Sequence, residues 1–242
     1  MATVTLMDST QDQICRGFLR IHQPARGYRF NLDSILLAAF SCGQAAPGVV
    51  VDAGAGCGVV GLYVAKVTGQ RTVLLERQAA MVALAARNAQ DNQLPQAHAV
   101  HGDFCSVPLQ DGCVGLLVSN PPFLTPGTGR PSPNPQRTLS HQAIHGGGQD
   151  VLTQATRLLS PQGALVCLLP PEQSAALFAD GLYLRRVWTL SPREGQAATR
   201  VVTVWRREPG AVVRETRTIH GADGRFCPWV DDVLEGRVHG VG

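Results

Sequence analysis

The chain has 242 residues, of which 44% are hydrophobic and 16% charged, and its formal net charge is +3. This composition is typical of a well-packed globular protein and excludes a disordered one, because enough apolar surface is available to form a core. Apolar runs stay shorter than the roughly 18 residues that a membrane-spanning helix needs. The first eight residues lack the basic start and apolar core of a signal peptide. We therefore expect one α/β domain with short additions, located in the cytoplasm and without a membrane partner.

The cysteines and the basic residues carry further information. Seven cysteines are scattered singly, without a Cys-x-x-Cys pair or a cluster at zinc spacing, which predicts buried thiols in a reducing compartment and no metal site. Arginine makes up 20 of the 21 basic residues, Lys66 being the exception. Nine arginines but only four acids lie between Arg185 and Arg225. Such an excess can hold phosphates, and planar guanidinium groups can stack on exposed bases.

Hydrophobic periodicity predicts alternating strands and helices. Residues 17–24 alternate enough for a short strand or hairpin, and a helical pattern follows an N-cap candidate at Asn31. This alternation predicts a parallel sheet that is covered on both faces. The expected strands are 49–53, 71–76, 97–102, 113–119 and 163–169, with a final strand pair at 182–188 and 200–205, and the expected helices are 59–67, 78–90, 148–159 and 230–234.

The same hydrophobic pattern divides the chain into three parts. Residues 1–30 are expected to form an N-terminal arm, residues 31–208 the main domain, and residues 209–242 an appendage that packs on it, because so short a tail cannot form an independent core. Residues 124–137 are rich in proline and glycine, which predicts a mobile loop beside the site.

The strand at 49–53 leads into a glycine turn with glycines at 54, 56 and 58. Glycines at this spacing allow a tight turn and a close approach of the backbone to a ligand. The spacing is tighter than the Gly-x-Gly-x-x-Gly of dinucleotide-binding folds. Glu76 ends the next strand, 24 positions after Asp52, which is close to the roughly 20-residue offset at which an acid binds ribose hydroxyls.

Two more polar groups follow later strands. Asp103 and Phe104 end the third apolar stretch, and the tetrapeptide Asn120-Pro121-Pro122-Phe123 follows the fourth. The tetrapeptide puts an amide side chain, a carbonyl acceptor and an aromatic ring at one strand end. These three groups can hold a planar amino group while it attacks an electrophile. The complete order resembles the class I S-adenosylmethionine methyltransferases and disfavours a nicotinamide dehydrogenase.

The resemblance extends to a narrower family, the bacterial tRNA1(Val) adenine-37 N6-methyltransferases. Residues 23–38, with Gly-Tyr-Arg-Phe followed by Leu-Asp-Ser, are the most specific part of it. The glycine turn, the tetrapeptide, residues 191–202 and residues 220–226 are also similar to the family, so that nearly the whole chain is covered. Departures are Gln142, where the family has an acid, Cys227 in place of threonine, and the scarcity of lysine. The resemblance implies a Rossmann-like class I methyltransferase fold, with a mostly parallel seven-stranded sheet, helices on both faces and an antiparallel final strand pair.

The resemblance also implies S-adenosylmethionine as cofactor and RNA, with tRNA expected, as substrate. The glycine turn would hold the methionine and ribose moieties and Asp52 would orient it, while Asn31 or Asp33 can reach the cofactor's ammonium group. The implied cofactor residues are Asn31, Asp33, Asp52, Gly54, Gly56, Gly58, Glu76 for the ribose hydroxyls, Asp103 for the adenine amino group and Phe104 for the adenine ring.

The implied catalytic residues are those of the tetrapeptide. Asn120 Oδ1 and the Pro121 carbonyl would accept hydrogen bonds from the target amino group, with Pro122 completing the turn, and Phe123 would stack on a flipped adenine. No general base is required before methyl transfer, so we do not assign His141 or His145 to that role.

Three alternatives stay open. A glutamine amide in a protein presents the same delocalised nitrogen, although release-factor methyltransferases usually carry tyrosine after the two prolines and a longer, helical N-terminal domain. Another RNA, such as rRNA, is a second alternative, and a non-catalytic RNA-binding module is a third. Neither the RNA position nor the oligomeric state follows from the sequence.

Overall fold

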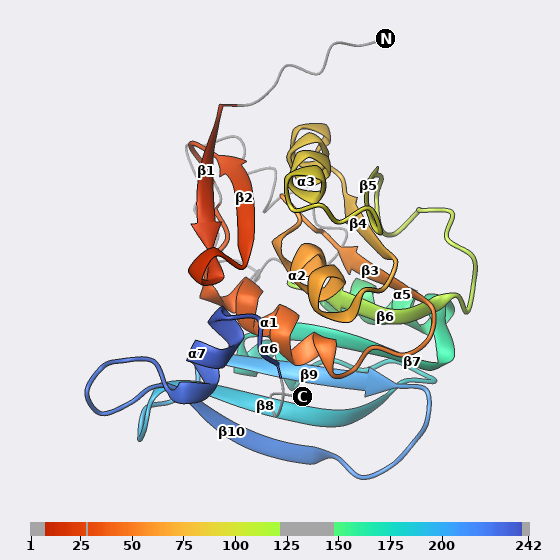
Figure 1. Cartoon of the computed structure of the whole chain (residues 1–242). Helices are drawn as coiled ribbons and strands as arrows, with labels where there is room; N and C mark the ends of the chain where they lie inside the picture. The colour runs from red at the N-terminus through yellow and green to blue at the C-terminus, as the bar shows by residue number, and fades with distance from the viewer. Residues whose placement is uncertain (1–7, 28, 122–147, 239–242) are drawn as a thin grey trace.

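The computed structural model describes residues 8–27, 29–121 and 148–238. Its centre is a sheet of eight strands in the order β10-β8-β9-β7-β6-β3-β4-β5 (Figure 1). Neighbouring strands are parallel except at β9, which runs antiparallel to both β7 and β8. The strands are β3 (Val49–Ala53), β4 (Thr72–Glu76), β5 (Ala97–His101), β6 (Val114–Ser119), β7 (Leu159–Leu169), β8 (Tyr183–Arg193), β9 (Arg200–Arg206) and β10 (Val213–His220).

The parallel arrangement brings the carboxyl ends of all strands except β9 to one edge of the sheet. Ala53, the last residue of β3, pairs in register with Leu75 of β4 on one side and with Ser119 of β6 on the other. Glu76 pairs with His101 at the end of β5. The segments that follow these strands therefore lie side by side, which is where open α/β sheets bind their ligands.

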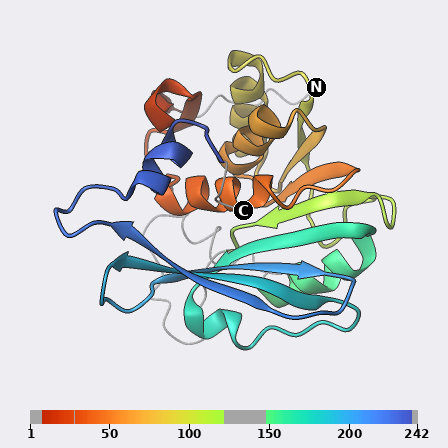
Figure 2. The same cartoon turned by 60° about the horizontal axis from the view of Figure 1, so that its bottom comes forward.

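Helices cover both faces of the sheet. One face carries α1 (Leu32–Cys42), α2 (Val59–Thr68), α3 (Ala79–Asp91) and α7 (Pro228–Leu234), which share one hydrophobic core, whereas α5 (Gly148–Leu158) belongs to the core on the opposite face (Figure 2). The short helix α6 (Pro171–Ser174) follows β7. Along β6, Leu116 and Val118 enter the first core and Leu117 enters the second. Burial on both faces explains why this strand is an unbroken apolar run.

Residues 17–24, for which a short strand or hairpin was predicted, contain the second strand of a hairpin whose first strand lies before them. Strands β1 (Ser9–Ile14) and β2 (Leu19–Pro24) pair antiparallel, with η1 (Cys15–Gly17) between them, and they form a separate two-stranded sheet. Arg16 in η1 makes ion pairs with Asp231 and Glu235, in and just after α7. The hairpin is thus fastened to the C-terminal part of the chain.

The predicted fold class is confirmed, and the sheet carries one strand more than expected. The additional strand, β10, lies within the segment predicted as an appendage and pairs in parallel with β8. Arg214, Glu215 and Arg217 interrupt its sequence, so β10 contains no apolar run. Charged residues fit here because β10 is an edge strand, with one neighbouring strand and mostly exposed or half-buried side chains. The division of the chain into arm, domain and appendage stays a prediction. Across the described ranges, no helix is long and apolar enough to cross a membrane.

Candidate cofactor and amino-group site

The glycine turn after β3 uses a backbone conformation that other residues rarely adopt. The φ angles of Gly54, Gly56 and Gly58 are +78°, +57° and +91°, in the left-handed region where glycine carries no steric cost. A Cβ atom on Gly54 would meet no atom within 4 Å, whereas one on Gly58 would approach Leu74 Cδ1 to 3.1 Å. Gly54 therefore leaves an open face for a ligand, and Gly58 allows α2 to pack closely on β4.

Asp52 supports this turn from inside the protein. Its Oδ2 accepts a hydrogen bond of 2.8 Å from the backbone N–H of Gly61, in the first turn of α2. Burial raises the pKa of the Asp52 carboxyl to about 7, and the nearby charge of Glu76 adds to this rise, while the hydrogen bond from Gly61 opposes it. This position is consistent with the predicted role of orienting the turn.

Gly61 itself was not predicted as a site residue. A Cβ atom there would lie 2.2 Å from Leu74 Cδ2 and 3.0 Å from Asp52 Cβ, so a side chain does not fit. The available signal was its position one helical turn after Gly58.

Glu76 lies beside the turn at the end of β4. Its Oε2 accepts from Gly56 N at 2.9 Å, and its Oε1 accepts from Gln78 N at 2.8 Å. A carboxylate offers about four lone-pair positions, so each oxygen keeps capacity for a further donor such as a ribose hydroxyl.

Asp103 and Phe104 follow β5 at the same edge. Asp103 Oδ1 accepts from Cys105 N at 2.9 Å, and its Oδ2 lies 4.0 Å from an Arg77 nitrogen. Phe104 is half-buried and packs against the core on the α5 side of the sheet. Both residues therefore stand near Glu76, as the order of motifs predicted.

Asn31 and Asp33 stand at the start of α1. Asn31 occupies the predicted N-cap position without making a side-chain cap, and its Nδ2 donates to Asp33 Oδ2 at 3.3 Å. The same Asp33 oxygen accepts from Arg200 Nε at 2.8 Å. Arg200 begins β9, so its contact with Asp33 spans 167 positions. No local pattern pointed to this partner.

Asn120 directly follows β6, next to the glycine turn. Its predecessor Ser119 pairs with Ala53 and donates from Oγ to the Ala53 carbonyl at 3.1 Å. Asn120 Oδ1 is buried and has no hydrogen-bond partner among the residues that the structure describes, and Pro121 is buried beside it. Buried amide oxygens are nearly always satisfied, so this atom is suited to accept a hydrogen bond from a ligand. Pro122, Phe123, the predicted loop at 124–137, His141 and His145 lie outside the described residues.

The edge thus combines an open glycine turn, an acid with spare acceptor capacity and an amide oxygen that has no partner in the described part of the chain. These residues fit a ligand that donates hydrogen bonds from hydroxyl and amino groups. No cluster of three or more potential metal ligands occurs within the described ranges, and the seven cysteines are free.

The strand order and this edge define a methyltransferase domain. The family model described as methyltransferase small domain matches residues 33–176. The match covers more than half of the chain, and the chain belongs to this family.

Curated relatives and solved structures agree with this assignment. A Tolumonas auensis protein named tRNA1(Val) (adenine(37)-N6)-methyltransferase is 28% identical, over 86% of this chain and 89% of its own. An Erwinia tasmaniensis protein of the same name is 28% identical, over 80% and 81%. A predicted O-methyltransferase from Agrobacterium tumefaciens superposes with a TM-score of 0.64 at 22% identity, over 84% of this chain and 96% of that one. TYW2 of M. jannaschii, solved with AdoMet, gives 0.56 at 13% identity, over 85% and 88%. At these identities, the two structures support the fold alone.

Proposed function

We propose that this protein transfers a methyl group from S-adenosylmethionine to the exocyclic N6 amino group of an adenine in RNA, with tRNA as its substrate in the cytoplasm. The proposal rests mainly on Asn120 Oδ1, which is buried and lacks a partner among the described residues. Asn120 directly follows β6, and the last residue of β6 pairs with Ala53, just before the glycine turn. A methyl-transfer site needs a hydrogen-bond acceptor for the target amino group at such a place.

The residues of the strand edge fit the cofactor. When bound, S-adenosylmethionine supplies a methyl group that is activated by its sulfonium charge. Gly54 offers the open backbone, and Glu76 offers the remaining lone pairs of its carboxylate to the ribose hydroxyls. Asp103 keeps acceptor capacity for the adenine amino group beside Phe104.

Asn120 and Pro121 would act on the target base. The lone pair of an adenine amino nitrogen is delocalised into the ring, which makes the nitrogen a poor nucleophile. Two acceptors, Asn120 Oδ1 and the Pro121 carbonyl, would accept hydrogen bonds from the two amino hydrogens. This would turn the nitrogen lone pair out of conjugation with the ring. Positioning of this kind contributes most when the electrophile is already activated. Phe123 would stack on the flipped base, a contact worth about 1–3 kcal/mol per base.

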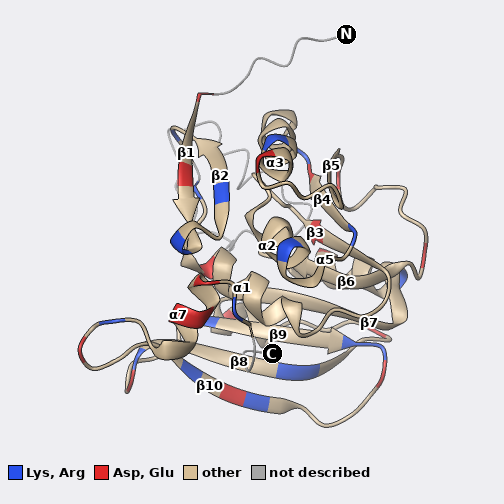
Figure 3. Ribbon diagram, viewed as in Figure 1, with Lys and Arg blue, Asp and Glu red and all other residues tan. Residues whose placement is uncertain are grey.

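The choice of tRNA is supported by the relatives and by charge. Both curated relatives cited above carry tRNA in their names and match most of this chain. Basic residues mark β8 and β10 (Figure 3), although Arg186 and Arg217 on these strands are paired with Glu215. Arg193 and Arg225 lie at or just beyond the carboxyl ends of β8 and β10, and both are exposed. Arg225 Nε also lies 3.9 Å from Asp223 Oδ2. Because both strand ends lie at the edge that carries Asn120, we expect these two exposed arginines to contact RNA phosphates.

A glutamine amide of a protein is the second candidate, since it needs the same two acceptors. Two features favour the nucleobase. Phe123 stands where the release-factor enzymes usually carry tyrosine, and the residues directly before α1 form the β1–β2 hairpin, whereas those enzymes usually carry helices there.

Incubation with labelled S-adenosylmethionine and separated cellular tRNA, rRNA and protein pools tests the proposal, with nucleoside mass spectrometry on the labelled pool. We expect N6-methyladenosine in tRNA. Label in rRNA would contradict the tRNA assignment, label in protein would favour the glutamine alternative, and no label in any pool would overturn the proposed activity.

A further inference from the structure

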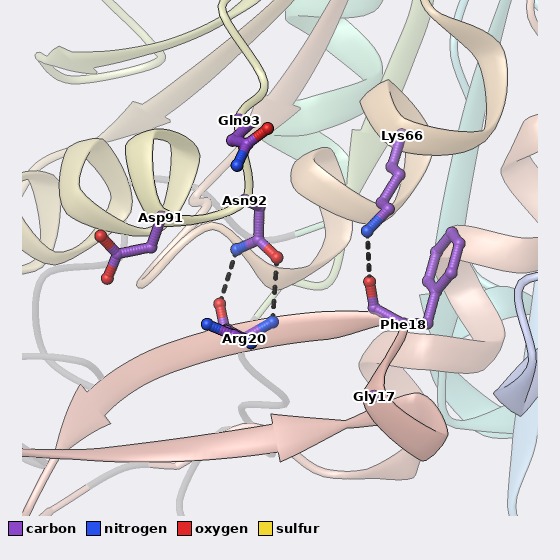
Figure 4. Close-up of a pocket in the computed structure, with 7 residues that line it drawn as sticks. All are labelled: Gly17, Phe18, Arg20, Lys66, Asp91, Asn92 and Gln93. Atoms are coloured by element: carbon purple, nitrogen blue, oxygen red, sulfur yellow. Dashed lines mark hydrogen bonds between the residues drawn. The ribbon is translucent and has the colours of Figure 1, made fainter.

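Asn88 of α3 and Asn92, the residue that caps the carboxyl end of α3, hold the N-terminal hairpin. Asn88 and Asn92 lie one helical turn apart and therefore project from the same side of the helix. Asn88 Oδ1 accepts from His22 N at 2.6 Å, and its Nδ2 donates to the His22 carbonyl at 2.9 Å. Asn92 makes the same pair of bonds with Arg20, at 2.9 and 2.6 Å (Figure 4). Each amide thus bonds both the N–H and the carbonyl of one β2 residue, as the backbone of a neighbouring strand would.

The two asparagines differ in the second hydrogen of Nδ2. In Asn92 this hydrogen is donated to the carbonyl of Asn88 in α3, at 2.7 Å. In Asn88 it reaches the carbonyl of Cys57 at 2.8 Å. Cys57 lies between Gly56 and Gly58 in the glycine turn, and Asn88 is fully buried at 0% exposure. Asn88 thus bonds both β2 and the turn, whereas Asn92 bonds only β2 and its own helix.

The contact matters because it restrains a carbonyl of the glycine turn. The N–H groups at the start of the turn are held separately, since Gly54 N and Ala55 N donate to the Leu75 carbonyl at 2.9 and 3.0 Å. Glycines populate a wide range of backbone angles, so each peptide group of the turn needs a restraint of its own. The Cys57 carbonyl is shielded from water and needs a donor, and the Asn88 amide fixes the direction in which this carbonyl points. With the Cys57–Gly58 peptide held, Gly58 N is in place for its 2.8 Å bond to the Ala55 carbonyl. On the other side of Cys57, Gly56 N meets Glu76 Oε2 at 2.9 Å.

We propose that Asn88 is a positioning residue of the cofactor site, which holds the glycine turn in its binding conformation through the Cys57 carbonyl and ties it to the hairpin. The inference rests on the proposed binding of S-adenosylmethionine at this turn. If Asn88 only attached the hairpin to α3, its role would be the same as that of Asn92. Asn92 therefore serves as the matched control.

The experiment is titration calorimetry of S-adenosylmethionine with the unsubstituted protein and with Asn88→Ala and Asn92→Ala. Each variant loses its bonds to β2, and both should unfold at a lower temperature. Only Asn88→Ala should bind the cofactor more weakly, by about tenfold, as expected for the loss of one buried hydrogen bond that leaves a carbonyl unsatisfied. Asn92→Ala should stay within about twofold of the unsubstituted protein. Hydrogen exchange without cofactor should also quicken in a peptide spanning residues 54–61 in Asn88→Ala alone.

Equal affinities or equal losses in the two variants would overturn the inference. Asn88→Ser, whose hydroxyl can still donate one hydrogen bond, is the milder variant if Asn88→Ala does not fold, and unchanged affinity in a folded Asn88→Ser would count against the proposal. If neither Asn88 variant folds while Asn92→Ala does, Asn88 acts in folding and the positioning role is wrong. Failure of the unsubstituted protein to bind the cofactor would instead refute the proposed function.

Discussion

Asp33 in the first turn of α1 and Arg200 at the start of β9 form a hydrogen-bonded ion pair of 2.8 Å at the edge of the sheet that carries the candidate site. Their side chains are 16% and 28% exposed, so the pair is only partly screened by water. It fastens the helix that leads into the domain to a late strand. Asp33 therefore has a partner already, and a cofactor ammonium group would share its carboxylate with Arg200.

A double-mutant cycle tests whether this pair stabilises the fold. Asp33→Asn and Arg200→Gln should each lower the free energy of unfolding, and the double variant should lose less than the sum, with a coupling of about 1 kcal/mol. Urea denaturation of the four proteins measures it. Strictly additive losses would mean that the contact contributes nothing to stability.

Removing the charge of Glu76 should weaken cofactor binding. In Glu76→Gln the carboxylate that bonds Gly56 and Gln78 becomes an amide, and the charge-assisted bonds that we propose to the ribose hydroxyls would be lost. We expect the dissociation constant of S-adenosylmethionine to rise by roughly tenfold to a hundredfold. Glu208→Gln, at an exposed position after β9, is the control and should bind normally. A Glu76→Gln protein with normal affinity would remove Glu76 from the cofactor site.

The raised pKa of Asp52 predicts a stability that falls with rising pH. Its folded-state pKa is about 7, above the ordinary value of 3.8, so the folded protein binds more protons than the unfolded chain between these values. The free energy of unfolding should therefore decrease from about pH 4 to about pH 7. Asp52→Asn should lack this contribution, which is on the order of 4 kcal/mol at most. Denaturation at pH 5 and pH 7.5 measures the difference, and identical pH profiles of both proteins would contradict the assignment.

Gly61→Ala should destabilise the protein although it adds only one methyl group. The new Cβ would collide with Leu74 Cδ2 at 2.2 Å, and overpacking of this kind typically costs about 1–3 kcal/mol. At Gly102 the nearest atom to a Cβ is 3.4 Å away, so Gly102→Ala is the matched control. Thermal unfolding of both variants decides the matter, and equal midpoints would show that α2 can move away from β4 at little cost.

Sequence reasoning worked where local chemistry determines structure. The apolar runs that became β3, β4 and β6 are buried on both faces, and the glycine turn needs left-handed backbone angles that favour glycine. It failed where the partner is distant in the chain. Asn88 meets His22 across 66 positions and Cys57 across 31, and neither contact leaves a local pattern. Strand β10 was missed because its pairing with β8 comes from backbone hydrogen bonds, which do not depend on apolar side chains.

The most direct test of the central claim is Asn120→Ala, assayed for methyl transfer to the RNA pool that takes label and for cofactor affinity by titration calorimetry. The Asn120 oxygen is proposed to serve the target amino group and not the cofactor. Turnover should therefore fall by at least roughly a hundredfold, the usual effect of removing one positioned hydrogen-bonding group at a reaction centre, while the dissociation constant of S-adenosylmethionine changes by no more than a few-fold. Full turnover, or loss of cofactor binding together with turnover, would contradict the account.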